Sequence, residues 1–535
     1  MGKTFFYIAK TRNKTTSSWI YNSTSEIKYL IRVISYVREN LSKEFSASMI
    51  FIVCIFIIYG LYVLKGYSRS KHEPPPLSNG LPIIGHAHQL FGGGLRLWET
   101  VKTKSHECCK AGDVTTLSLG PIKCYVLTDA GDFMTVANTC LEKGILYDFA
   151  KPWLGEGLLT APLAKWKTHR KLLNTAFNQQ VLDGFLDVFN IQSRRLLEQF
   201  AVEEGKGHFD PENYIMRNSL ETIFLTATGI DLRADKTLNE NYVTLTDRVL
   251  RSVVYRFQNI WLYKDFIWNM SSTKKQQDKD IEFLHDVANM IIKQRKKTYL
   301  PTTTKATGNN LKSFSDMLFD LEGSNGESVF SYQDVKDHVN TLIVAGYDTV
   351  ATNLVITLIL IGSYKEVQDK IYKELEEVFE QSDRDVEKRD LQRLTYLEAV
   401  IKESLRLYPT APVISRLIDK DFKLKNYTLY SGNNCLLSIY GANRHPVWGE
   451  DANDFKPERW LNPETLPKNS NYFLSFSLGR RNCLGKAYAM MWLKTIISHV
   501  LRKYLVTGDH NNILFRFDFV LKPHSGRYIA IEKRK

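Results

Sequence analysis

The most hydrophobic uninterrupted stretch of the chain lies close to its N-terminus. Residues 45–64 read FSASMIFIVCIFIIYGLYVL, twenty residues without a charge, with charged residues directly on both sides. A helix of this length extends about 30 Å, the thickness of the hydrocarbon core of a bilayer. Because the flanking charges are so sharply placed, the pattern favours one transmembrane helix over a buried core helix.

The segments around this stretch indicate the domain organisation. Residues 1–44 form a basic tail, and the stretch after the apolar run contains Pro74-Pro75-Pro76, which favours an extended spacer. The rest of the chain shows no internal repeat and no second linker. We therefore expect an N-terminal tail at 1–44, a membrane anchor at 45–64, a basic and proline-rich hinge at 65–85, and one large domain at 86–535.

Helical periodicity dominates the large domain. The longest helical pattern begins at Ser331, with Asp334 three residues later as a capping signal, and continues to about Gly362. It is amphipathic at first and apolar nearly all round over residues 350–361, so this helix should cross the core. Short β patterns occur near residues 115–128 and 515–532. The predicted fold class is mainly α with a small β portion.

Composition and charge exclude several classes of protein. The chain has 535 residues, 44% of them hydrophobic, which rules out a disordered, collagenous or disulfide-stapled protein. Its seven cysteines form no CxxC pair, so neither a disulfide framework nor a zinc ribbon fits. The net charge of +13 comes without any nucleic-acid-binding motif, and we expect no nucleic-acid partner.

One cysteine lies in a turn whose other residues each have a use if the sulfur binds haem iron. The decapeptide FSLGRRNCLG begins at Phe476, which can cover the sulfur of Cys483. Gly479 permits a bend that a Cβ would block, and Arg481 can pair with a haem propionate. Gly485 lets the next helix begin close to the porphyrin, with its N-terminal amides directed at the sulfur. These features predict Cys483 as the axial iron ligand.

With this loop, of pattern FxxGxRxCxG, the chain resembles the cytochrome P450 monooxygenases. Residues 147–159 (YDFAKPWLGEGLL) and 166–171 (WKTHRK) are similar to the microsomal family-4 clan common in insects. The resemblance covers roughly residues 74–535 and implies the cytochrome P450 fold behind an N-terminal single transmembrane helix. It also implies haem b, held noncovalently apart from the Cys483–iron bond. Ala345 stands where many members of the clan carry a glutamate that esterifies the haem.

The resemblance assigns roles to further motifs. Glu403 and Arg406, of an ExxR helix, would form a buried ion network behind the haem together with Arg459 of a later PER segment. An indole and a guanidinium one turn apart on a basic helix can donate to the haem propionates. Three partners for the propionates are expected besides Arg481, namely Trp166, Arg170 and Arg416.

The long helix carries the sequence AGYDT at residues 345–349, which matches the family pattern (A/G)Gx(D/E)T. We expect the glycine to loosen the hydrogen-bond ladder of the helix and leave room for dioxygen and a water. Thr349 would position the water, and Asp348 would relay protons, so these two are the expected catalytic residues. Residues 155–161, 343–349, 410–415 and 515–520 are expected to line the substrate site.

The implied function is insertion of one oxygen atom of O2 into a lipophilic small molecule, such as a fatty acid, a hormone- or pheromone-like lipid, or a xenobiotic. Electrons would come from NADPH through NADPH–cytochrome P450 reductase, with cytochrome b5 as a helper. The chain itself has no convincing dinucleotide motif, since Gly92-Gly93-Gly94 indicates a turn.

We expect the protein in the endoplasmic reticulum membrane, with the catalytic domain cytosolic. Three alternatives stay open at this point. They are an oxygen-independent rearrangement or dehydration on the same fold, a haem-binding pseudoenzyme, and a mitochondrial enzyme supplied by a ferredoxin.

Overall fold

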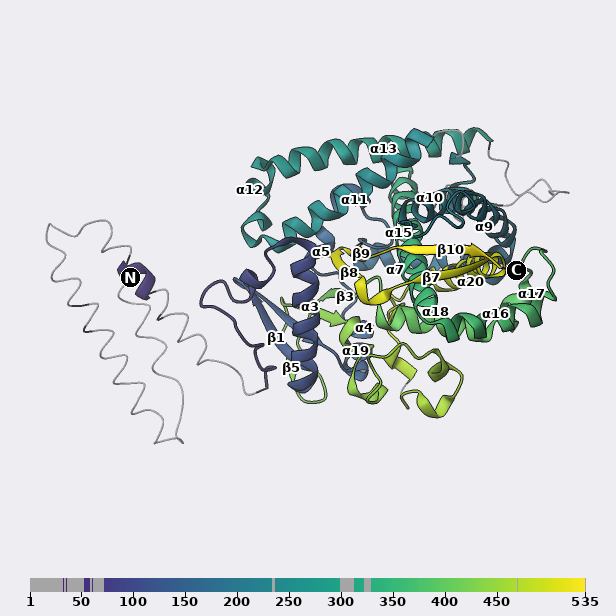
Figure 1. Cartoon of the computed structure of the whole chain (residues 1–535). Helices are drawn as coiled ribbons and strands as arrows, with labels where there is room; N and C mark the ends of the chain where they lie inside the picture. The colour runs from purple at the N-terminus through teal and green to yellow at the C-terminus, as the bar shows by residue number, and fades with distance from the viewer. Residues whose placement is uncertain are drawn as a thin grey trace. The chain divides into compact units, whose positions relative to one another are not determined.

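The computed structural model describes residues 72–232, 236–298, 312–321, 329–468 and 470–534, together with residues 32, 35, 52–57 and 60. The chain divides into two units, Met1–Arg69 and Ser70–Lys535, and the second is the body of the protein (Figure 1). Of the predicted anchor, only residues 52–57 and 60 are described, and they are helical. The rest of the anchor and nearly all of the predicted tail lie outside the described residues.

The body is mainly helical, as the sequence predicted. Its α-helices are α3 (Gly93–Lys110), α4 (Ala130–Thr139), α5 (Ile145–Asp148), α6 (Lys151–Leu154), α7 (Leu163–Ala176), α8 (Gln179–Gly184), α9 (Leu186–Phe200), α10 (Glu212–Thr228), α11 (Lys236–Gln258), α12 (Asp265–Met270), α13 (Ser272–Thr298), α14 (Phe314–Asp320), α15 (Tyr332–Ser363), α16 (Lys365–Phe379), α17 (Lys388–Arg393), α18 (Thr395–Leu407), α19 (Ile439–Ala442) and α20 (Lys486–Lys503). Short 3₁₀ turns, among them η5 (Pro457–Trp460), connect some of them.

In the described residues, the β portion consists of one four-stranded sheet and three two-stranded ribbons. The sheet has the order β1-β2-β6-β3, in which β2 and β6 are parallel and the outer pairs are antiparallel. Its strands are β1 (Val114–Leu119), β2 (Ile122–Leu127), β3 (Val413–Leu417) and β6 (Asn434–Ser438). The ribbons pair β4 (Phe422–Lys423) with β5 (Thr428–Leu429), β7 (Tyr504–Gly508) with β10 (Ile529–Lys533), and β8 (Leu514–Asp518) with β9 (Val520–Ser525). Both predicted β regions are therefore confirmed.

Part of the predicted hinge packs onto the body. The amide of Thr116 in β1 donates to the carbonyl of Pro75, and the amide of Leu77 donates to the carbonyl of Thr116. These hydrogen bonds and a parallel bridge between Pro76 and Thr116 attach the proline-rich segment to the edge of the sheet.

The predicted long helix is α15, which begins where the sequence indicated. Ser331 accepts a hydrogen bond from the amide of Asp334, and the Asp334 carboxylate in turn accepts one from the amide of Ser331. Among the described residues, α15 is the one helix apolar enough to cross a membrane, but 78% of its most apolar window is buried in protein. It lies in the middle of the body and packs against α10, α13, α18, α20 and β9 (Figure 1). It is therefore a core helix, and its middle turns line the site.

Candidate active site

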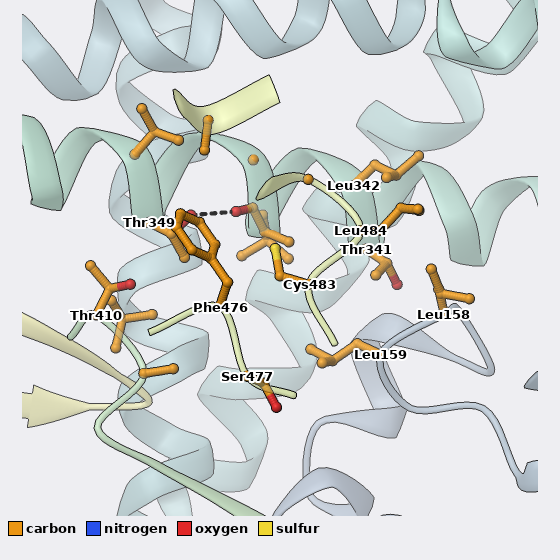
Figure 2. Close-up of a pocket in the computed structure, with 18 of the residues that line it drawn as sticks. Leu158, Leu159, Thr341, Leu342, Thr349, Thr410, Phe476, Ser477, Cys483 and Leu484 are labelled. Atoms are coloured by element: carbon orange, nitrogen blue, oxygen red, sulfur yellow. Dashed lines mark hydrogen bonds between the residues drawn. The ribbon is translucent and has the colours of Figure 1, made fainter. Parts of the chain in front are cut away.

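A cavity of about 360 Å³ lies between α15, the start of α20 and the turn that carries Cys483 (Figure 2). Its wall is predominantly apolar. All four segments expected to line a substrate site contribute, for example through Leu158, Val344, Val413 and Phe517. No sequence pattern indicated the contributions of α10 and α11, which supply Ile223, Thr226, Ala227 and Leu250. Such a lining selects lipophilic molecules and excludes water.

The turn around Cys483 has the backbone bend that Gly479 predicts. Gly479 has a φ of +72°, and a Cβ at this position would lie 2.9 Å from the carbonyl oxygen of Ala137. A side chain would therefore be strained and would clash with α4. The amide of Cys483 donates to the carbonyl oxygen of Phe476 at 2.9 Å, which closes the turn. Figure 2 shows the Cys483 sulfur and the Phe476 ring at the cavity wall.

Cys483 is exposed to the space of the cavity, although many protein atoms surround its sulfur. Burial raises the pKa of the Cys483 thiol, and the amide of Gly485 together with the charges of Arg170 and Lys486 opposes this rise. A metal cation deprotonates a coordinating thiol, so an iron at this position would supply the remaining stabilisation of the thiolate. A Cβ at Gly485 would meet no atom within 4 Å, so the space beside this residue belongs to the cavity.

Cationic side chains gather at one wall of the cavity. Arg416 is fully buried and Arg481 is 6% exposed, yet two guanidinium nitrogens of each have no hydrogen-bond partner among the described residues. Burial and the neighbouring Arg416 lower the pKa of Arg481 to about 10. Unpaired buried charges are costly, so this wall fits an anion with several acceptor oxygens. Haem, with two propionates, is such a group.

Lys143 is a functional candidate that the sequence analysis missed. It lines the cavity with its ammonium 4.2 Å from the ring centre of Tyr147, and no carboxylate of the described residues lies within 4.0 Å of it. Burial, followed by the charges of Arg416 and Arg481, lowers the pKa of Lys143. An isolated lysine just before a short helix carries no sequence signal. Only the fold brings it beside β3, where the backbone of Lys143 forms an isolated antiparallel β-bridge with the backbone of Arg416.

The two predicted residues of α7 also lie at the cavity. The guanidinium of Arg481 stacks on the ring of Trp166, with its carbon 4.5 Å from the ring centre. Arg170 donates to the backbone carbonyl and the side-chain oxygen of Asn482, both at 2.9 Å. These contacts tie α7 to the turn that holds Cys483. The structure thus brings all four predicted propionate partners to one cavity.

Glu403, Arg406 and Arg459 form a buried ion network, as expected. The Glu403 carboxylate accepts two hydrogen bonds from Arg406 and one from Arg459, all at 2.8 Å. It also accepts from the indole of Trp460 at 2.9 Å and from the amide of Lys456 at 3.0 Å. Every acceptor position of this buried carboxylate is therefore used by a donor from α18, η5 or the residue before η5.

A short path connects this network to the cysteine turn. Arg406 donates to the carbonyl of Asn443 at 2.8 Å. The side chain of Asn443 accepts from the amide of Leu474 and donates to the hydroxyl of Ser475, which directly precedes Phe476. The ion network therefore holds the backbone from which the turn starts, although it does not line the cavity.

The AGYDT segment of α15 differs from the expectation in two respects. A Cβ at Gly346 would lie 2.4 Å from Ile223, so this glycine serves the close packing of α15 on α10, and the helix continues unbroken through it. Thr349 lines the cavity and donates to the carbonyl of Ala345 at 2.7 Å (Figure 2). Asp348 does not line the cavity but forms an ion pair of 2.7 Å with Lys522.

Comparisons with known proteins identify the family of this chain. A family model described as Cytochrome P450 matches residues 74–530. The chain is similar to Cytochrome P450 4V2 of Mus musculus, with 29% identity over 88% of this chain and 92% of the relative. It is also similar to Cytochrome P450 4c3 of Drosophila melanogaster, with 31% identity over 72% and 75%, and to Cytochrome P450 4c21 of Blattella germanica, with 31% identity over 75% and 82%.

Proposed function

Because the chain belongs to the cytochrome P450 family and is therefore a cytochrome P450 monooxygenase, we propose that it inserts one oxygen atom of O2 into a fatty acid, a hormone- or pheromone-like lipid, or a xenobiotic. The electrons come from NADPH through a reductase. The observation that carries this proposal is that the sulfur of Cys483 opens into an apolar cavity. The same cavity has a wall of cations with unpaired donors, which fits the propionates of haem.

Haem b would be the cofactor, and the sulfur of Cys483 would bind its iron. When bound, haem with a thiolate ligand supplies the activation and cleavage of dioxygen. Trp166, Arg170, Arg416 and Arg481 would hold the propionates, while Phe476 and Gly485 shape the space around the sulfur. Ala345 has no side-chain oxygen that could form an ester, so the haem would be held noncovalently apart from the bond between its iron and Cys483.

The chain's own residues orient the substrate and manage protons. The apolar wall binds the hydrocarbon part of the substrate and excludes bulk water. The hydroxyl of Thr349 lies at the cavity, where it positions a water molecule as a proton donor. Asp348 relays protons to this hydroxyl from the adjacent side of α15.

The electron donor is NADPH–cytochrome P450 reductase, with cytochrome b5 as a helper, on the endoplasmic reticulum membrane. The predicted anchor at 45–64 supports this location. The exposed residues Arg480 and Lys486 flank the Cys483 turn and provide positive charge at which an acidic donor protein can dock.

The test is the spectrum of the reduced protein under carbon monoxide. Haem-loaded wild-type protein should show the red-shifted Soret band of thiolate ligation, and Cys483→Ser should lose it. Cys109→Ser, which changes a cysteine away from the cavity, should retain the band. A folded, haem-loaded wild-type protein without the band would contradict the assignment. Turnover with fatty acids, terpenoids and insecticides in the presence of NADPH and reductase then identifies the substrate class.

A further inference from the structure

Six charged side chains form a cluster beside the cavity wall. Three are carboxylates and three are cations, and they come from four elements: Asp247 and Arg251 of α11, Asp348 of α15, Arg516 and Asp518 of β8, and Lys522 of β9. None of the six lines the cavity, but each of these elements supplies a residue that does, namely Leu250, Thr349, Phe517 and Val520.

Lys522 occupies the centre of this cluster. Its ammonium lies 2.7 Å from Oδ1 of Asp348 and donates to Oδ1 of Asp247 at 3.2 Å. The side chains of Lys522 and Asp348 are 4% and 1% exposed, whereas that of Asp247 is 25% exposed. One lysine thus connects the acid of the AGYDT segment to a carboxylate that reaches solvent on a different helix.

We propose that Lys522 is a positioning residue for Asp348: its ammonium stabilises the ionised form of this carboxylate and keeps it directed away from the cavity. The same ammonium also binds Asp247 of α11, so the two carboxylates share one cation. The inference rests on the proposed role of Asp348 as a proton relay. It means that proton delivery at Thr349 depends on the β8–β9 ribbon and on α11, which also form part of the wall around the substrate.

The charged groups around Asp348 determine in which direction its pKa should move in each variant. The pKa of the Asp348 carboxyl is raised, with burial as the largest cause; Lys522 and Arg516 oppose this rise, and the like charge of Asp247 adds to it. Tyr347, the neighbour on α15, is buried and uncharged in the ordinary pH range because burial raises its pKa. Removing Lys522 and removing the charge of Asp247 should therefore move the titration of Asp348 in opposite directions.

The experiment titrates Asp348 directly in the haem-loaded, full-length ferric enzyme. Infrared spectra over a range of pH identify its carboxylic-acid band as the one that disappears in Asp348→Asn. In Lys522→Met the midpoint of this band should move up by about one pH unit, a tenfold change in proton affinity. In Asp247→Asn it should move down, and Lys522→Arg should stay close to wild type.

Lys494→Met is the matched control. Lys494 is equally buried and is paired with Glu398, but it lies on α20 away from the cluster. Its loss should leave the Asp348 midpoint unchanged. The same variants are then compared for product formed per NADPH as a function of pH, and the acidic limb of that profile should follow the infrared midpoints.

Equal midpoints in wild type and Lys522→Met, or shifts of the same sign in Lys522→Met and Asp247→Asn, would overturn the inference. If Lys522→Met does not retain haem, Asp247→Asn decides alone, because a carboxylate that reaches solvent tolerates this change: a downward shift supports the inference and any other result refutes it. The infrared titration needs no turnover. A protein that shows the opposite shifts but oxidises nothing would refute the proposed function and leave the inference standing.

Discussion

Replacing Glu403 by glutamine should destabilise the haem-binding core while leaving its packing volume nearly unchanged. The change removes the charge that Arg406 and Arg459 share, and both guanidinium groups are buried. Breaking a buried charge network by removing one partner costs about 3–5 kcal/mol. Arg459 keeps a second carboxylate, Asp451, at 3.4 Å, so its charge is not left wholly unpaired. We therefore expect the lower end of this range, a loss of about 3 kcal/mol in the free energy of unfolding.

The assay is denaturant unfolding followed by the haem Soret band and by far-ultraviolet circular dichroism. Because Arg406 holds Asn443, and Asn443 holds the backbone before the cysteine turn, the Soret signal should be lost at lower denaturant than the helical signal. Glu99→Gln is the control, since Glu99 is exposed and, within the part of the chain that the structure describes, forms its ion pair with Lys102 three residues along α3. Its cost should stay below about 1 kcal/mol. Similar losses in the two variants would refute the assigned role of the network.

Three further predictions concern the cavity and its surroundings. Thr349→Ala should lower product per NADPH and release peroxide, whereas Thr352→Ala, a change at a buried threonine of α15 away from the cavity, should not; equal coupling in the two would contradict the role of Thr349. Lys143→Met should speed the transfer of haem to apomyoglobin about tenfold, because it removes one charged hydrogen bond to a haem propionate. Lys151→Met, which removes an exposed partner of Asp148, should leave the transfer rate unchanged. Burial lowers the pKa of His338 from 6.5 to about 3, so between these values the unfolded chain binds more protons, and stability should fall as the pH falls, by up to about 1.4 kcal/mol per unit. Unfolding at pH 7 and pH 5 should show a weaker pH dependence in His338→Gln, and an unchanged dependence would count against this explanation.

The features that the sequence predicted well are those set by local chemistry. The start of α15 follows from a serine and an aspartate three residues apart, which satisfy each other's backbone amides. The turn at Gly479 follows from a left-handed backbone that only glycine adopts without strain. The residues of the decapeptide that begins at Phe476 are neighbours in the chain, so their spacing carries the geometry of the site directly.

The features that escaped prediction depend on contacts between distant segments. Lys143 gains its place at the cationic wall only because its backbone pairs with Arg416 of β3. The sequence pattern predicts that Gly346 loosens the hydrogen-bond ladder of the helix, but the structure requires a glycine there because Ile223 of another helix leaves no room for a Cβ. In both cases the deciding neighbour lies far away in the sequence, and no local pattern indicates which residue it is.

The orientation of Asp348 away from the cavity could, by contrast, have been predicted from the geometry of an α-helix. Consecutive residues of a helix point about 100° apart, because 3.6 residues complete one turn. If the Thr349 hydroxyl faces the cavity, the carboxylate of the preceding residue cannot face the same point. An acid in this position must contact whatever packs on the adjacent side of α15, here β9 with Lys522. Any proton that passes from Asp348 to Thr349 must therefore travel around the helix. For this reason the groups beside the cavity wall belong to the chemistry of the site as much as the groups that line it.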